Sequence, residues 1–161
     1  MDNTRIFIGD TTTPKGMQSM RKRGSMSLYR KIDHIGIAVR SLDAALKTYS
    51  AGLGMQADHI EEVPEQKTRV ALIPLGESRL ELLEAMEEDS PIGRFIAKRG
   101  EGLHHICIQV EDLEQTLLHL KEAGVRLIDE VPRRGAGNCL VAFIHPTSAS
   151  GVLVELSQSS L

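Results

Sequence analysis

The chain of 161 residues is poor in aromatic residues, with no Trp, two Tyr and three Phe, and its formal net charge of −3 supplies no overall positive field. Proteins that bind nucleic acid use a basic surface to attract phosphates and, for single strands, aromatic rings on which bases stack. The composition therefore argues against nucleic-acid binding.

Cysteines and long apolar runs are equally scarce. Cys107 and Cys139 lie inside apolar segments without the Cys-x-x-Cys spacing of metal-binding or redox pairs, so we interpret them as small buried residues in a reducing compartment. No apolar run approaches the roughly 20 residues that span a bilayer, and no short apolar core precedes a small-residue cleavage site. We expect neither membrane insertion nor secretion.

The N-terminal part lacks acidic residues over a long stretch. From Thr11 to Ile32 there are six basic residues and no acidic one, among Ser, Thr, Gly, Met and Pro. We therefore expect residues 1–30 to form a disordered basic extension. A mitochondrial targeting segment has a similar composition, but Asp2 and Asp10 fit it poorly, and an upstream start codon or an added extension explains it more simply. The expected location is the cytoplasm, or the mitochondrial matrix if the source is eukaryotic.

Apolar alternation and capping residues predict two similar sets of strands and helices. Ser41 and Asp112, the latter with Gln115 three residues later, each precede a predicted helix. Ser90 followed by Pro91 predicts a short connecting helix. The segments that alternate as half-buried strands do are residues 32–39, 69–75, 79–85, 104–110, 125–131, 139–145 and 151–157.

The length fits one domain made of two small fused units. We expect a single domain over residues 31–161. Its expected parts are a first module at about residues 32–86, a connector helix at about 90–100, and a second module at about 103–158.

The chain repeats itself once. Setting DHIGIAVRSLDAAL against HHICIQVEDLEQTL without a gap matches His34 with His105 and five apolar pairs, all at an offset of 71 residues. The last strands of the two halves correspond as well and place Glu81 opposite Glu155, at an offset of 74 residues. Two like units that pack about a pseudo-twofold axis bring such equivalent positions together.

A lone His or Glu on a strand is ordinarily a structural or solvent-facing residue. One His and one Glu at matching positions in both halves instead favour a metal site formed by His34, Glu81, His105 and Glu155. Alternation in the last strand supports this, because Val154 and Leu156 share the face opposite Glu155. Two imidazoles and two carboxylates suit a borderline or hard divalent ion, and ligand type alone leaves Co²⁺, Mn²⁺, Zn²⁺, Ni²⁺ and Mg²⁺ open.

The other histidines are expected to be ordinary polar residues. His104 is the rival of His105, but strand alternation puts the two on opposite faces and the repeat selects His105. His59 is expected in a charged loop, His119 on an exposed helix face, and His145 at a turn.

These residues resemble those of the vicinal oxygen chelate superfamily, whose members are built from paired βαβββ units around a metal. Within it, residues 31–158 look similar to the methylmalonyl-CoA epimerases. The resemblance implies an α+β fold with one metal-binding cleft and the same four metal ligands that the repeat selects. The segments that carry it are DHIGIAV, PEQ, ELLEAMEEDSPIGRFIAKRGEGLHHI, GVRLIDEVPRRGAG and VAFIHPTSASGVLVEL.

The resemblance also implies the interconversion of (2R)- and (2S)-methylmalonyl-CoA by removal and return of the α-proton through an enolate, which a divalent ion would stabilise as a Lewis acid. It implies one such ion per chain, Co²⁺ before the other four ions named above, an acyl-CoA substrate and, by analogy, a homodimer.

Inversion at a carbon needs proton donors on both faces. Glu155 is the first candidate base, and Glu81, or a water held near Gln66, is the candidate for the second. Similar epimerases carry a glutamate shortly after PEQG, whereas PEQKTRVAL has no carboxylate at that strand position. Arg133 and Arg134 are candidate contacts for the phosphates of CoA.

Two other functions remain open. A glyoxalase-type lyase or isomerase would use the same metal and similar enolate chemistry, although the DSPI and GLHHI segments argue against it. A metal-free, drug-sequestering module is disfavoured because all four ligand-type residues are retained. Extradiol dioxygenases of related fold use two His and one carboxylate around iron, and a fourth protein ligand would crowd that site.

Overall fold

The computed structural model describes residues 28–135 and 139–159. The expected N-terminal extension lies, up to residue 27, outside the described residues. Residues 29 and 30, which we assigned to that extension, belong to the first strand instead. No helix in the described part of the chain has the length and apolar character needed to cross a membrane.

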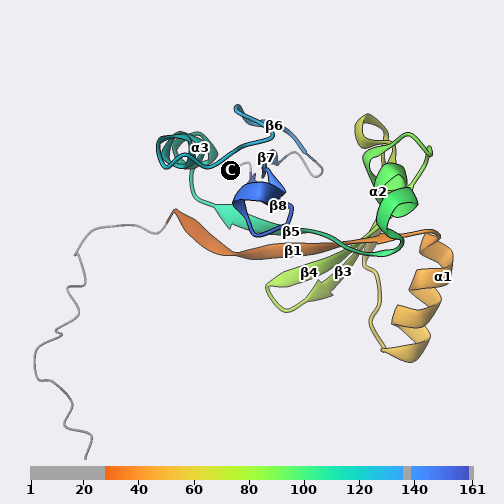
Figure 1. Cartoon of the computed structure of the whole chain (residues 1–161). Helices are drawn as coiled ribbons and strands as arrows, with labels where there is room; N and C mark the ends of the chain where they lie inside the picture. The colour runs from red at the N-terminus through yellow and green to blue at the C-terminus, as the bar shows by residue number, and fades with distance from the viewer. Residues whose placement is uncertain (1–27, 136–138, 160–161) are drawn as a thin grey trace, which may run out of the picture.

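Eight strands and three α-helices make up the described chain (Figure 1). Their bounds are β1 (Tyr29–Val39), α1 (Leu42–Lys47) continued by a π-helical turn (Thr48–Gly52), β2 (His59–Val63), a 3₁₀ turn (Pro64–Gln66), β3 (Thr68–Leu75), β4 (Ser78–Ala85), α2 (Pro91–Arg99), β5 (Gly102–Val110), α3 (Leu113–Glu122), β6 (Arg133–Arg134), β7 (Leu140–Ile144), a 3₁₀ turn (Pro146–Ser148) and β8 (Val154–Gln158).

The strands form one curled sheet in the order β2-β3-β4-β1-β5-β8-β7-β6. This order reads as two copies of one arrangement joined where β1 and β5 pair antiparallel. In each copy the first strand lies parallel to the last, β1 beside β4 and β5 beside β8. The expected α+β fold of paired modules is confirmed, and with it the neighbouring first and last strands on which the site argument depends.

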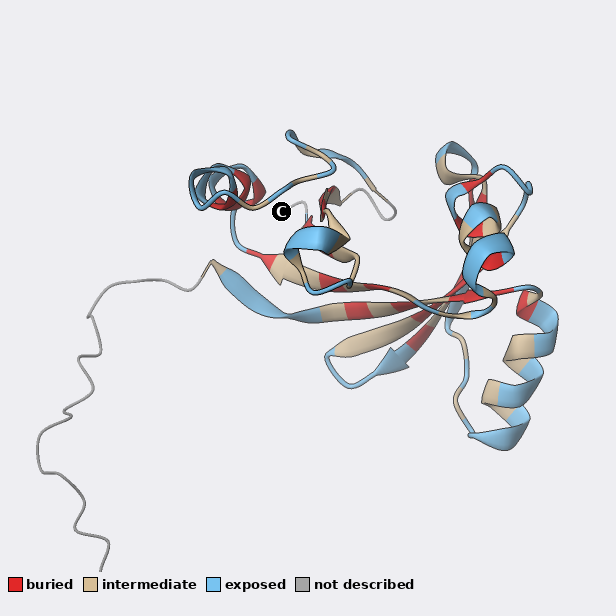
Figure 2. Ribbon diagram, in the orientation of Figure 1, coloured by how far each residue is buried: buried red, intermediate tan, exposed pale blue. Residues whose placement is uncertain are grey.

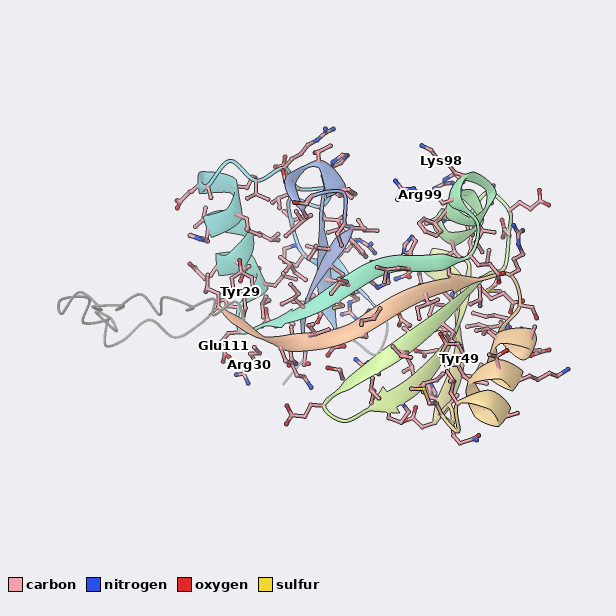
Figure 3. All side chains as sticks on the ribbon, turned by 60° about the horizontal axis from the view of Figure 1, so that its bottom comes forward. Tyr29, Arg30, Tyr49, Lys98, Arg99 and Glu111 are labelled. Carbon is pink, nitrogen blue, oxygen red and sulfur yellow. The ribbon has the colours of Figure 1, made fainter. Side chains whose placement is uncertain are left out.

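The helices cover the sheet with apolar residues that the sequence pattern placed on one face. In the second module, Leu113 and Leu117 of α3 pack on Ala142 and Leu156. The first module has an equivalent cluster, in which Leu42 of α1 contacts the inner residues of β3 and β4. Buried positions accordingly follow the strands and the inner sides of the helices (Figure 2). Where β1 pairs with β5, Arg30 at the start of β1 forms an ion pair with Glu111, the residue after β5 (Figure 3).

The connector α2 packs on the other face of the first module. Ile92 and Ile96 contact Val63, Val70 and Leu83. Ser90 accepts a hydrogen bond from the Gly93 amide at 3.0 Å, and the helix ends at Gly100, so both predicted ends of this helix are confirmed. Because Val70 and Leu83 also line the cleft described below, α2 closes one end of that cleft.

The strand predicted over residues 125–131 is wrong. This segment makes a single bridge, between Leu127 and Ile144, and regular pairing resumes only at β6. The cause is Asp129, whose carboxylate accepts a hydrogen bond from the Phe143 amide at 3.0 Å where a backbone carbonyl would otherwise accept it. Apolar alternation cannot show that a side chain replaces the backbone in the ladder.

A second correction concerns His59, which we expected in a charged loop. It begins β2, an edge strand of sequence HIEEV that pairs with β3. Charged residues are common on edge strands because they discourage pairing with other chains, and here they conceal the strand pattern.

The cap of α3 is confirmed and gives a first prediction. Asp112 accepts a hydrogen bond from the Gln115 amide at 3.0 Å, which satisfies one free donor at the start of the helix. Asp112→Ala should therefore lower the free energy of unfolding by about 1 kcal/mol in urea denaturation. Gln115→Ala is the control, since it keeps both the amide and the cap, and it should change the free energy by less than about 0.5 kcal/mol. Equal effects of the two changes would contradict the capping role.

Candidate metal centre

Four side chains that the repeat selects meet in one cleft of about 580 Å³. His34 comes from β1, Glu81 from the neighbouring β4, His105 from β5 and Glu155 from the neighbouring β8. All four are buried, with exposed fractions of 7%, 9%, 4% and 9%. Val154 and Leu156 pack in the core on the other face of β8, as alternation predicts.

The donor atoms converge on one point. His34 Nε2 lies 3.0 Å from His105 Nε2, 3.3 Å from Glu81 Oε2 and 3.9 Å from Glu155 Oε2. His105 Nε2 lies 3.3 Å from Glu155 Oε2 and 3.7 Å from Glu81 Oε2. Ligands at roughly 2.0–2.2 Å from a shared divalent ion are separated by about 3.0–3.5 Å, so this spacing fits one ion. The ligand atoms of His34, His105 and Glu155 all lie within 4.8 Å of one another.

The charges of the cleft also favour a cation. Burial raises the pKa of Glu155 to about 7 and raises that of Glu81. Burial, with His34 and His104 nearby, lowers the pKa of His105 to about 2, so this ring is a neutral donor. Burying two carboxylates is unfavourable unless a positive charge compensates them. A divalent ion between them would remove that penalty, so the residues present fit a metal centre.

A second cluster of ligand-type residues consists of Asp33, His34 and Cys107. It is a poorer candidate for two reasons. Asp33 already accepts hydrogen bonds from His34 Nδ1 at 2.9 Å and from Arg79 at 2.5 Å. Burial raises the pKa of the Cys107 thiol, which keeps it protonated and unsuited to bind a metal.

The expectation that His104 points away from His105 is wrong. In the pairing of β1 with β5, Gly36 lies opposite His105 while Ile37 lies opposite Leu103, so His104 is an extra residue in a β-bulge. His104 therefore lines the same cleft as His105, and their Nδ1 atoms are 2.9 Å apart. Gly36 matters for another reason, since its backbone lies directly against the His105 ring.

The residues predicted to contact substrate separate into two groups. Gln66, in the 3₁₀ turn after β2, and Arg133, in β6, line the cleft. The guanidinium of Arg133 lies 5.2 Å from the centroid of the Phe143 ring and 3.4 Å from Asp129 Oδ2. Arg134 is exposed and does not belong to the cleft lining.

Sequence reasoning missed three further carboxylates on the cleft wall, Asp33, Glu61 and Glu65. Glu65 could have been found, because it lies within the PEQ segment that carries the resemblance. Glu61 could not, because its strand was not predicted. It lies directly across from Val70 in the pairing of β2 with β3.

The sequence model of the Glyoxalase/Bleomycin resistance protein/Dioxygenase superfamily matches residues 33–143. The chain belongs to this superfamily. The relatives narrow the class: the mitochondrial methylmalonyl-CoA epimerase of Bos taurus is 35% identical over 156 residues, which are 96% of this chain and 89% of the relative. The ethylmalonyl-CoA/methylmalonyl-CoA epimerase of Cereibacter sphaeroides is 38% identical over 130 residues, 80% of this chain and 97% of the relative. Within the superfamily, the chain groups with the methylmalonyl-CoA epimerases.

Solved structures agree with this grouping. A variant of the Streptomyces coelicolor methylmalonyl-CoA epimerase, in complex with 2-nitronate-propionyl-CoA, is 39% identical to this chain with a TM-score of 0.78, and the match covers 82% of this chain and 96% of that one. The epimerase from Mycobacterium tuberculosis is 38% identical with a TM-score of 0.79, covering 85% of this chain and 93% of that one. The resemblance that the sequence motifs indicated is therefore confirmed.

Proposed function

We propose that this chain is a methylmalonyl-CoA epimerase that interconverts the (2R) and (2S) forms, with one divalent ion held by His34, Glu81, His105 and Glu155. The observation that carries the proposal is the convergence of four buried donor atoms, 3.0–3.9 Å between each imidazole and its neighbours, in a chain of this family.

When bound, the ion would supply Lewis acidity, which stabilises the negative charge that develops on the thioester and carboxylate oxygens as the α-proton leaves. The two imidazoles and two carboxylates would fix its place. The apolar walls of the cleft, among them Val70, Leu72 and Phe143, exclude water, and this strengthens each electrostatic interaction inside.

Glu155 is the proposed base for one face of the carbon. Its Oε2 atom approaches the imidazoles, so Oε1 is the atom that would take and return the proton. In the metal-free site, burial raises the pKa of this carboxyl to about 7, which makes the carboxylate a stronger base than an exposed glutamate.

The base for the other face belongs to Glu81 or to a water held near Gln66, and the structure adds Glu61. The cleft-facing residues of β3 in this chain are Thr68, Val70 and Leu72, none of which has a carboxylate. Because Glu61 lies opposite Val70 and lines the cleft, β2 offers a carboxylate where β3 has none. The variants Glu61→Gln and Glu81→Gln distinguish these candidates. Each is tested separately for isotope exchange with a single epimer of the substrate.

We propose Arg133 as a contact for the phosphates or carboxylate of the substrate, because it is a cation at the cleft wall. Arg134 remains a weaker proposal, since it lies outside the lining.

We also propose Co²⁺ as the ion, a homodimer as the assembly, and the cytoplasm, or the matrix in a eukaryote, as the location. Metal analysis of protein purified without added ions and light scattering on a sizing column test the first two.

Hydrogen–deuterium exchange at C2 of methylmalonyl-CoA tests the proposed function. Metal-loaded protein in heavy water should catalyse exchange, and a chelator should slow it at least 100-fold, about the lower end of what one transition-state stabilising group contributes. Readdition of the metal should restore the rate. Absence of exchange in the metal-loaded protein would refute the epimerase function. The hemithioacetal of glutathione, offered in parallel, tests the glyoxalase alternative.

Metal affinity should fall as the pH is lowered from about 8 to about 6. Burial raises the pKa of Glu155 to about 7. Burial lowers the pKa of His34, but the hydrogen bond to Asp33 and the two nearby carboxylates outweigh it and raise the pKa above its usual value. Below these pKa values the metal-free site holds protons that the ion must displace. Metal affinity should change by up to about tenfold per pH unit for each proton released, and it should level off above both pKa values.

Calorimetric titration with the metal in two buffers of different ionisation enthalpy measures this proton release directly. A metal affinity that does not vary between pH 6 and pH 8, with no proton released, would contradict the prediction.

A further inference from the structure

His34 and His105, the two histidines of the cluster, each follow a residue that a β-bulge inserts into its strand. In β1, Ile32 pairs with Ile108 and His34 with Cys107, so Asp33 is the extra residue. In β5 the extra residue is His104, as described above. Asp33 and His104 are separated by the same 71 residues as the two histidines they precede. The bulge therefore belongs to the repeat itself.

The bulges change the direction of the extra side chains. In a regular strand, neighbouring residues point to opposite faces of the sheet. Here Asp33 lines the same cleft as His34, and His104 lines the same cleft as His105. Bulges are frequent beside functional sites because they turn a side chain in this way.

On the first-module side, the inserted residue holds its histidine through a charged hydrogen bond. Asp33 Oδ1 accepts from His34 Nδ1 at 2.9 Å, and Arg79 donates to the same oxygen at 2.5 Å. The Asp33 and His34 side chains are 13% and 9% exposed, so solvent screens the bond between them only weakly, whereas the Arg79 side chain is 42% exposed. The ring of His34 is thus fixed with Nε2 directed at the cluster.

On the second-module side, the inserted residue is an imidazole. His104 Nδ1 lies 2.9 Å from His105 Nδ1, and the His104 ring packs edge-on against Phe95 of α2, with the centroids 4.9 Å apart. A histidine that offers Nε2 to a cation carries its proton on Nδ1. His105 therefore donates to His104 Nδ1, which accepts.

We propose that Asp33 and His104 are paired positioning residues, which orient His34 and His105 so that both Nε2 atoms face one cation. The proposal rests on the metal binding proposed above. The two residues do not act equally: a carboxylate makes its imidazole a stronger electron donor than a neutral acceptor does. Loss of the Asp33 carboxylate therefore weakens metal binding more than loss of the His104 acceptor.

Titration of the full-length, metal-free protein with Co²⁺, followed by its visible absorption spectrum and by competition with a chelator, tests the proposal. His104→Phe keeps a ring against Phe95 but has no acceptor, and should weaken Co²⁺ binding about 10- to 100-fold and shift the spectrum. His104→Asn, which retains an acceptor near the place of Nδ1, should bind within about threefold of the unaltered protein. Asp33→Ala should weaken binding more than His104→Phe, and Asp33→Asn should fall between Asp33→Ala and the unaltered protein.

Matched controls are His119→Phe and Asp43→Ala, which make the same changes at exposed positions outside the cleft. Co²⁺ binding and spectra unchanged in His104→Phe and Asp33→Ala would overturn the positioning role while leaving the metal centre intact. Failure of the unaltered protein to bind Co²⁺ would instead refute the metal centre, and this inference with it. If Phe or Ala prevents folding, the Asp33→Asn variant decides the test. Weaker Co²⁺ binding in Asp33→Asn than in Asp43→Ala supports the positioning role, and equal binding in the two overturns it.

Discussion

Glu155→Gln is expected to slow epimerisation about 10²- to 10⁴-fold, the usual range for removal of a general base. Glutamine is nearly the same size and keeps an oxygen that can face the imidazoles, but its amide does not accept a proton at neutral pH. Binding of the metal should therefore weaken much less than the reaction slows.

Rates of epimerisation and the metal content of the same samples measure this difference. Glu62→Gln is the matched control, since Glu62 lies on β2, is exposed and does not line the cleft. It should leave both quantities unchanged. Full activity in Glu155→Gln at normal metal content would remove Glu155 as the base, and loss of metal together with activity would assign it a ligand role alone.

The four cluster residues could be predicted because the chain repeats. His34 and His105 are far apart in sequence, and no local motif joins them to Glu81 or Glu155. The register of the repeat nevertheless relates them in pairs, and burial of two like apolar sheet faces requires the pairs to converge. Parallel neighbours β1 and β4, and their equivalents β5 and β8, supply the convergence.

The errors at His104 and in the segment before β6 have one physical origin, which is departure from regular pairing. His104 was assigned to the wrong face because period-two alternation assumes that no residue is inserted, and a bulge has no reliable sequence signal. The segment before β6 was assigned to a strand because its apolar pattern says nothing of the Asp129 side chain that interrupts the ladder. Both departures occur beside the cleft, where irregular backbone turns polar groups toward the site.

Gly36→Ala is expected to disable the proposed metal centre although Gly36 offers no ligand. A Cβ atom at this position would lie 2.3 Å from Cε1 and 2.4 Å from Nδ1 of the His105 ring, closer than real Cβ atoms approach any atom. The ring has to move, and its contacts with His104 and His34 oppose that movement. Metal affinity should fall about 100-fold or more, and the free energy of unfolding of the metal-free protein should drop by about 1–3 kcal/mol.

The repeat by itself predicts that Gly36→Ala is tolerated. The residue equivalent to Gly36 in the second half is Cys107, which lies opposite His34 and carries a side chain. Metal affinity from chelator competition and stability from urea denaturation of Gly36→Ala therefore decide between the two predictions, tolerance from the repeat and loss from the close contact with the His105 ring. Gly52→Ala is the control, since a Cβ there meets nothing within 4 Å and Gly52 lies outside the cleft. Metal affinity in Gly36→Ala equal to that of Gly52→Ala would show that the His105 ring can shift without leaving the cluster, and that its fixed position is not what holds the ion.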